Sequence, residues 1–180
     1  MGNFHHTAPA RTSAALLAVV GTMTSVVEAR SPQTDATSGI TAFTQHCFSP
    51  FLTAEKAAKA FNYPNIRYDF YDLDPFTSAA PTPAKTSATP GTDRRCEVSF
   101  ESDFTTEATG PVVAKLVSEG ITTPADVPTT HAETPGTAFL AARRLNPEKI
   151  AIVHIGTRQG PNGLETYLNV ERLPLSEVSK

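Results

Sequence analysis

Two consecutive β-patterns in the last third of the chain constrain the fold more than any other feature. Residues 149–157 (Lys-Ile-Ala-Ile-Val-His-Ile-Gly-Thr) form an almost continuous apolar run, which is typical of a strand buried on both faces. A link rich in Gly, Pro and Asn follows at 159–163. Beyond it, the alternation places Leu164, Thr166, Leu168 and Val170 on one side of a strand and Glu165, Tyr167, Asn169 and Glu171 on the other. We therefore predict a β-hairpin whose second strand has one buried and one solvent-exposed face.

The residues before this hairpin predict further helices and strands. Ile40, Phe43 and Cys47 share one helical face, and Thr53 is a suitable N-cap for a second helix over 54–61. Strands are expected at 66–73, 95–101 and 137–145, the second of them marked by alternating Cys96, Val98 and Phe100. A third helix, ended by Gly120, is expected along the face formed by Ala108, Val112, Val113, Leu116 and Val117. Pro111 lies inside this span, and the alternative is that the regular helix begins only there, with Pro111 in its first turn.

The resulting element order, ααββαβββ, defines the expected fold class. It is satisfied by an α+β fold with an antiparallel sheet of about four to five strands and two to three helices packed on one face. Residues 39–180 are expected to form a single domain. The Pro/Thr/Ala-rich segments at 75–93 and 121–136 are expected to be mobile loops, because such a composition packs poorly.

The N-terminus has the three-part pattern of a secretory signal peptide over residues 1–29. Arg11 lies in the first part, residues 14–20 are an unbroken apolar run, and Val27-Glu28-Ala29 offers slim side chains for cleavage between Ala29 and Arg30. Residues 30–38 are expected to be a flexible leader. The mature protein is then exported, to a bacterial periplasm or the medium. The alternative is that the segment is a disordered or core-forming N-terminal helix.

The two cysteines, Cys47 and Cys96, are interpreted in the light of this export signal. An even number of cysteines in an oxidising compartment favours a disulfide, and the spacing is too long for a C-x-x-C redox motif. The bridge closes a loop of about 50 residues, for which chain entropy predicts a stabilisation of roughly 4 kcal/mol. A reactive or metal-binding thiol is the alternative.

Composition excludes several classes of function. Charged residues make up 18% of the chain and the formal net charge is −3, so the basic stripe expected of a nucleic-acid-binding protein is missing. A hydrophobic content of 39% with 10 Phe is enough for a packed core, which argues against a long disordered chain. No run reaches the roughly 18 apolar residues of a membrane span, so no stable membrane insertion is expected after signal cleavage.

The sequence contains none of the common catalytic or cofactor-binding motifs. A G-x-S-x-G nucleophile motif, a Walker loop, a dinucleotide glycine fingerprint and an H-E-x-x-H zinc motif are all missing. His46, His131 and His154 are too widely spaced to indicate a metal site. Asp69, Asp72 and Asp74 are interpreted as a solvated strand end, because a calcium loop needs more ligands and a turn glycine. We predict no metal and no cofactor, and the sequence leans against an enzyme without deciding the question.

Two further features indicate a recognition surface. Aromatic residues crowd the segment 61–76, and two arginine pairs lie at 94–95 and 143–144. Guanidinium groups brought together hold a carboxylate or a phosphate, and exposed tyrosine beside arginine is typical of binding surfaces. The surface hypothesised on this basis consists of Arg67, Tyr68, Tyr71, Arg94 and Arg95. The alternatives are that these aromatic rings are core residues and that the arginines are paired with neighbouring carboxylates.

Three classes of function remain open. The first is an exported, non-enzymatic module that binds a small ligand or an exported protein. The second is an envelope-associated hydrolase with an unrecognised active site, and the third is an accessory subunit of an exported complex. An exposed apolar patch around Phe70 favours a binding module or a subunit, whereas a deep cleft that gathers His154, an acid and a strained serine favours the hydrolase.

Overall fold

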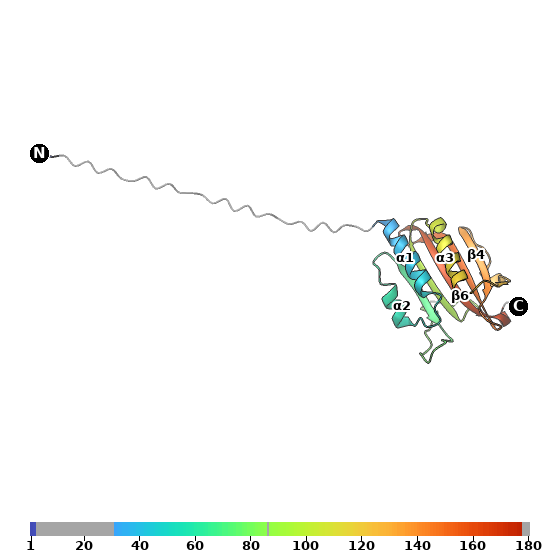
Figure 1. Ribbon diagram of the computed structural model, residues 1–180. Helices are drawn as coiled ribbons and strands as arrows, with labels where there is room; N and C mark the ends of the chain where they lie inside the picture. The colour runs from blue at the N-terminus through green and yellow to red at the C-terminus, as the bar shows by residue number, and fades with distance from the viewer. Residues whose placement is uncertain (3–30, 86, 178–180) are drawn as a thin grey trace.

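A twisted antiparallel sheet with helices against one face forms the body of the molecule (Figure 1). The computed structural model describes residues 1–2, 31–85 and 87–177. Within these residues the elements are α1 (Pro32–His46), α2 (Ala54–Ala60), β1 (Arg67–Asp72), β2 (Arg94–Glu101), α3 (Thr105–Ser118), β3 (Pro124–Ala125), β4 (Thr137–Arg144), β5 (Lys149–Gly160) and β6 (Gly163–Pro174), with short 3₁₀ turns at Thr129–His131 and Leu175–Glu177. The predicted α+β class is confirmed.

The sheet has six strands in the order β1-β2-β6-β5-β4-β3, not the four to five expected. The additional strand is β3, two residues in which Pro124 and Ala125 pair with β4. A two-residue bridge has no detectable period in the sequence, which explains why it was not predicted. Within the segment 75–93, Thr82 forms an isolated bridge with Asp72, the last residue of β1. The mobility expected for the two loops stays a prediction.

The predicted hairpin is the centre of the sheet. β5 and β6 are 12 residues long each, and their pairing continues to Gly160 opposite Gly163. The connection is therefore shorter than the link expected at 159–163. Gly163 has a φ of 125°, a conformation that side chains other than glycine's rarely adopt. β2 pairs along the other side of β6, so the Cys96 strand lies between β1 and β6.

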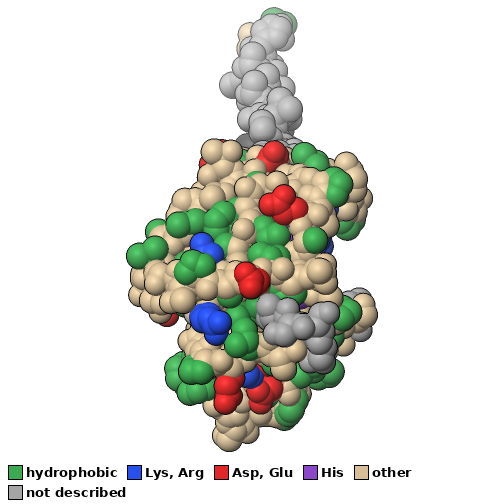
Figure 2. All heavy atoms as spheres, turned by 90° about the vertical axis from the view of Figure 1, so that its right-hand side faces the viewer, with side chains coloured by type: hydrophobic (Ala, Val, Ile, Leu, Met, Phe, Trp, Pro, Cys, Tyr) green, Lys and Arg blue, Asp and Glu red, His purple; other side chains and the backbone are tan. Residues whose placement is uncertain are grey.

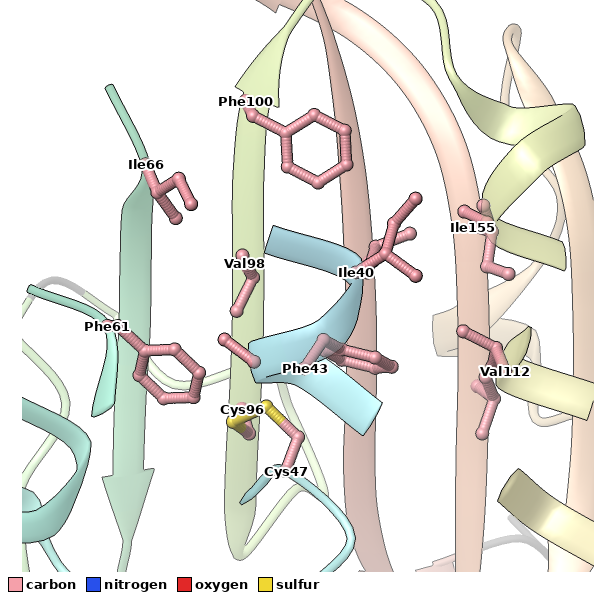
Figure 3. Packing of buried hydrophobic residues seen from close by; sticks show 14 of the residues in the cluster. Ile40, Phe43, Cys47, Phe61, Ile66, Cys96, Val98, Phe100, Val112 and Ile155 are labelled. Atoms are coloured by element: carbon pink, nitrogen blue, oxygen red, sulfur yellow. A yellow bond between two sulfur atoms is a disulfide. The ribbon is translucent and has the colours of Figure 1, made fainter. Parts of the chain in front are cut away.

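Pairing register collects the apolar residues on the helix side of the sheet. Cys96 lies opposite Val170, and Val98 lies opposite Leu168. Helix α1 brings Phe43 down onto these strands, as Figure 3 shows together with Val112 from α3. Helix α1 lies so close to the sheet at Gly39 that a Cβ atom there would lie 2.5 Å from Cδ1 of Phe100 on β2.

The predicted disulfide is confirmed and lies inside this core. Cys47, just beyond α1, is bonded to Cys96 of β2, with the two Cα atoms 5.4 Å apart (Figure 3). Both cysteines are buried. The bridge links the end of α1 to β2, which is paired on both sides within the sheet.

Helix α1 begins earlier than the sequence analysis expected. Residues 32–38, expected as part of a flexible leader, are its first two turns. Ser31 is the N-cap, its hydroxyl accepting a hydrogen bond from the backbone of Thr34 at 3.3 Å, and Pro32 occupies the first helical position. Serine followed by proline is a start signal, so the leader prediction was wrong for a reason visible in the sequence. The expected signal peptide and the cleavage bond between Ala29 and Arg30 lie outside the described residues.

Helix α3 includes Ala108, so the alternative start at Pro111 is wrong. It starts at Thr105, whose backbone N–H and hydroxyl both donate to the Asp103 carboxylate, at 3.0 and 2.8 Å. Pro111 is therefore inside the helix and not in its first turn. Because Pro111 is on the exposed side, the carbonyl it fails to bond lies toward water. None of the helices among the described residues is long and apolar enough to cross a membrane.

Candidate ligand-binding pocket

The central strands extend further than the helices that cover them. Twelve residues of β-strand span about 40 Å, whereas the 14–15 residues of α3 and α1 span about 22 Å. Both helices end on the same side of the core, at Cys47 and Glu119. The helix-side face of the sheet is consequently uncovered at one end.

A pocket of about 480 Å³ lies at this uncovered end. Its volume is in the range typical of small-molecule sites. Its apolar lining comes from the sheet, from the ends of both helices and from two loops: Cys47, Phe48, Pro50, Pro75, Phe76, Ile121, Leu145, Ala151 and Val170. We call this cavity the sheet-end pocket.

The floor of the sheet-end pocket combines small apolar and cationic side chains. Arg94, Arg172 and Ala151 lie side by side in register on β2, β6 and β5. They share a face with Cys96 and Val170, because strand side chains alternate. Two guanidinium groups, that of Arg94 buried and that of Arg172 partly buried, therefore lie directly beyond the hydrophobic core.

Each floor arginine is held by carboxylates. The Nε of Arg172 donates to Asp93 at 2.6 Å, and its Nη2 donates to Asp72 at 3.0 Å. Arg94 lies 3.5 Å from the second oxygen of Asp72 and donates to the backbone carbonyl of Ser49 at 2.7 Å. Burial lowers the pKa of the Arg94 guanidinium, although the charge of Asp72 opposes this shift. Asp72 itself is buried, which corrects the expectation of a solvated acidic cluster.

Lys149 completes the cationic group. Its Nζ lies 2.5 Å from Asp74 and 2.8 Å from Asp93. Burial alone lowers the pKa of this ammonium, but the hydrogen bonds to the two aspartates raise it overall. The same bond from Lys149 holds the pKa of Asp74 below its usual value.

Two exposed phenylalanines stand at the rim of the sheet-end pocket. Phe76, which lines the pocket, is 71% exposed, and Phe51 beside it is 51% exposed. Their ring centroids are 5.6 Å apart in an edge-to-face arrangement. Large exposed apolar side chains in contact with each other are typical of a binding surface.

The opposite face of the sheet carries a network of polar and charged side chains. Glu171 accepts hydrogen bonds from Arg95 Nε at 2.8 Å and from the Thr89 hydroxyl at 2.7 Å, and it lies 3.1 Å from His131 Nε2. Burial alone raises the pKa of Glu171, but these bonds and the charge of Arg95 lower it to about 2. Glu171 thus ties both long loops to the sheet.

The same network extends along β6. Glu165 is paired with Arg67 and, at 2.8 Å, with Arg158, which also lies 2.5 Å from Glu97. The face expected to be solvent-exposed is therefore covered, and the following residues are buried: Glu165, Tyr167, Asn169 and Glu171. The expectation failed because loop residues and long arginine side chains lie over these strands.

The five residues of the hypothesised recognition surface do not form one surface. By strand alternation Tyr68 and Arg94 lie on the helix side, whereas Arg67, Tyr71 and Arg95 lie on the opposite side. Tyr71 is fully buried, under Arg95 and bonded through its hydroxyl to the backbone of Thr89. Of the five, Arg94 alone lines the sheet-end pocket.

The sequence analysis missed Lys149, Arg172 and Phe76 as candidate site residues. Lys149 and Arg172 carry no local signal, since their role depends on which strands pair and which loops close over them. Phe76 was noted only as part of an aromatic-rich segment. Its isolation within a Pro/Thr/Ala-rich stretch is the signal that would have identified it.

The histidines do not form a metal site. In the part of the chain that the structure describes, no group of three or more His, Cys, Asp or Glu side chains is placed to hold a metal ion. His154 Nε2 bonds the hydroxyls of Thr137 and Tyr167, at 2.8 and 2.9 Å. Burial lowers the pKa of His154. Among the described residues, no hydrogen bond joins His154 to a serine or a carboxylate.

Charges on the β4 side of the molecule are mixed in sign. Figure 2 shows Lys and Arg, Asp and Glu, and hydrophobic side chains interspersed on this face. Such a surface provides no extended field of one sign for a polyanion. That the protein does not bind nucleic acid stays a prediction.

No protein-family model matches the chain, and neither a curated protein nor a solved structure matches it. The functional argument therefore rests on the geometry of the sheet-end pocket and its surroundings.

Proposed function

We propose that the protein is an exported, non-enzymatic module that binds a small ligand in the sheet-end pocket. The observation that carries the proposal is a cavity of about 480 Å³ with apolar walls and a cluster of buried charges at its floor. Apolar walls supply affinity and a few fixed polar groups supply orientation. Export is supported by the N-terminal sequence pattern and by the disulfide, since disulfides persist in oxidising compartments.

Binding is better supported than catalysis by the state of the charged groups. Arg94, Lys149 and Arg172 are all engaged by carboxylates, and the hydrogen bonds to Asp74 and Asp93 raise the pKa of the Lys149 ammonium above its usual value. General acid–base catalysis needs a group that titrates near the working pH. The hydrolase alternative has less support, because His154 is bonded to hydroxyls of threonine and tyrosine.

A second candidate function is favoured by the exposed Phe51–Phe76 pair. An accessory subunit needs an exposed apolar surface, and this pair provides one, whereas Phe70, whose exposure was the feature that would favour a subunit or a binding module, is buried. Phe51→Ser separates the two candidates, because Phe51 is not among the pocket-lining residues. If a partner protein copurifies with the parent and is lost from this variant, the subunit function is supported.

The direct test of the proposed function uses N-phenyl-1-naphthylamine, a neutral probe whose fluorescence rises in apolar sites. We expect saturable binding to the purified protein and its loss in Ala151→Leu, because Ala151 lies on the pocket floor and a longer side chain fills the cavity. Val117→Leu is the matched control, since Val117 is exposed on α3. The control is expected to bind like the parent.

A second variant, at the rim of the pocket, keeps the test valid if Ala151→Leu does not fold. Phe76→Ser changes an exposed loop residue, so the fold is expected to be retained while probe affinity falls. If the parent binds no probe, or if both pocket variants bind as tightly as the parent, the proposed function is wrong.

A further inference from the structure

We infer that the ligand of the sheet-end pocket is amphipathic and carries a single negative charge on its headgroup, an inference that rests on the proposed function. The headgroup chemistry is that of a carboxylate or a singly charged phosphate ester. The inference derives from the balance of charges at the pocket floor and from the position of Asp74 within it.

The anchored charges at the pocket floor leave one positive charge unmatched. Three cations line the pocket: Arg94, Lys149 and Arg172. Asp72 and Asp93 face them from buried positions, with side chains only 4% and 14% exposed. Cations away from water need a counter-charge, and two fixed carboxylates cannot neutralise three of them.

Asp74 supplies the third negative charge through its contact with Lys149. Its carboxylate lies 2.5 Å from Lys149 Nζ, and its backbone carbonyl accepts a hydrogen bond from Arg172 Nη2 at 2.6 Å. Unlike the two anchored aspartates, its side chain is 69% exposed. It also belongs to the loop that follows β1, where backbone movement is less costly than within the sheet.

An anionic headgroup is therefore able to replace Asp74 at Lys149 and Arg172. The exchange keeps the floor neutral, and it returns the Asp74 carboxylate to water. The ligand's apolar part then lies against the hydrocarbon lining, which includes Phe48, Ile121 and Val170. A neutral ligand gains the apolar contacts alone.

The remaining carboxylates at the pocket do not change this balance. Glu119 is at the rim and is paired with Lys115 of its own helical turn, at 2.5 Å. Glu171 contributes to the lining, but its carboxylate bonds Arg95 and Thr89 on the opposite face of the sheet.

Competition between matched ten-carbon ligands tests the inference. Decanoate, decan-1-ol and decylammonium share a tail and differ in headgroup charge, and each is titrated against bound N-phenyl-1-naphthylamine. We expect decanoate to displace the probe at about tenfold lower concentration than decan-1-ol, equivalent to about 1.4 kcal/mol. Decylammonium is expected to be the weakest, because it meets the cations directly.

Two variants assign the preference to individual residues. Lys149→Met should abolish the higher affinity for decanoate while decan-1-ol still displaces the probe. Asp74→Asn should raise the affinity for decanoate, because it removes the carboxylate that competes with decanoate for Lys149. Lys59→Met, a matched change at an exposed ion pair on α2, should alter neither.

The outcomes separate this inference from the proposed function. If the probe binds and the three ligands displace it equally well, the proposed binding function is supported, but the inference of an anionic headgroup is wrong. If Lys149→Met retains the full advantage of decanoate, the assignment to this floor is wrong. If the probe does not bind at all, both proposals fail.

Discussion

The two faces of the central hairpin are both buried, but by different means. On the helix side, Val153, Ile155 and Leu168 pack against α1 and α3, and a disulfide anchors the end of α1. On the opposite side, apolar packing is limited to a small cluster around Ile150 and Ile152. The rest of that face is closed by ion pairs between strands and loops. The comparison shows that a covered sheet face need not be an apolar one.

The two faces also differ at their ends. Loops lie over the polar face, and their attachment depends on charges such as that of Glu171. The helix side is closed only as far as α1 and α3 extend, and the sheet-end pocket begins where they end. The contribution of apolar packing against α1 and α3 to stability is expected to be insensitive to pH, whereas the contribution of the Glu171 network on the loop side should vary with pH.

The largest expected effect is a charge placed on the apolar face. Leu168→Asp should prevent folding, because Leu168 is fully buried among hydrocarbon side chains and an unpaired carboxylate there costs more than about 4 kcal/mol. The same substitution at Leu164, exposed near the tip of the same strand, should be tolerated. Circular dichroism on the two variants decides the matter, and equal melting temperatures would show that the register is wrong.

Removal of the disulfide should be the next largest effect. Cys47→Ser and Cys96→Ser should each destabilise the protein by about 3–4 kcal/mol, and by similar amounts, because either change opens the same loop. Urea denaturation under non-reducing conditions measures both. If either variant unfolds at the parent's midpoint, the bridge does not stabilise the helix side.

On the polar face, Glu171→Gln should give a smaller and pH-dependent loss. A pKa lowered from 4.5 to about 2 is equivalent to about 3 kcal/mol of stability. Because the folded-state pKa is the lower one, this stability is present above pH 4.5 and is lost as the pH falls toward 2. The parent and the variant should therefore differ in urea midpoint at pH 7 and converge near pH 2. A constant difference across this range contradicts the assignment.

The smallest effect on stability is expected for a substitution in the sheet-end pocket. Asp74→Asn should change the free energy of unfolding by less than about 1 kcal/mol, because exposed ion pairs contribute little. Its effect on ligand preference should nevertheless be measurable. A loss of stability as large as that of Glu171→Gln would mean that Asp74 is a structural residue and not a displaceable one.

Local pattern predicted the helix side far better than the loop side. The alternation around Leu168 predicted the hairpin and contributed to the α+β class, because hydrophobic burial is reflected directly in residue type. The cysteine pair predicted the disulfide. Asn169 and Glu171 are equally buried, but polar residues carry no local sign that loops distant in sequence will cover them.

The sheet-end pocket was beyond prediction for a related reason. Its floor exists because β2, β6 and β5 bring Arg94, Arg172 and Ala151 into register, and strand order is not encoded in any one segment. Its depth depends on the difference between strand and helix lengths.

Methyl NMR during a titration with decanoate tests most directly the claim that the helix side ends in a ligand site. We predict chemical-shift changes at Ile121, Ala151 and Val170, which line the pocket. The methyl signals of Ile150, Ile152 and Leu173, on the opposite face of the same strands, should not change. Changes confined to the second set, or saturation without changes in the first, would contradict the account.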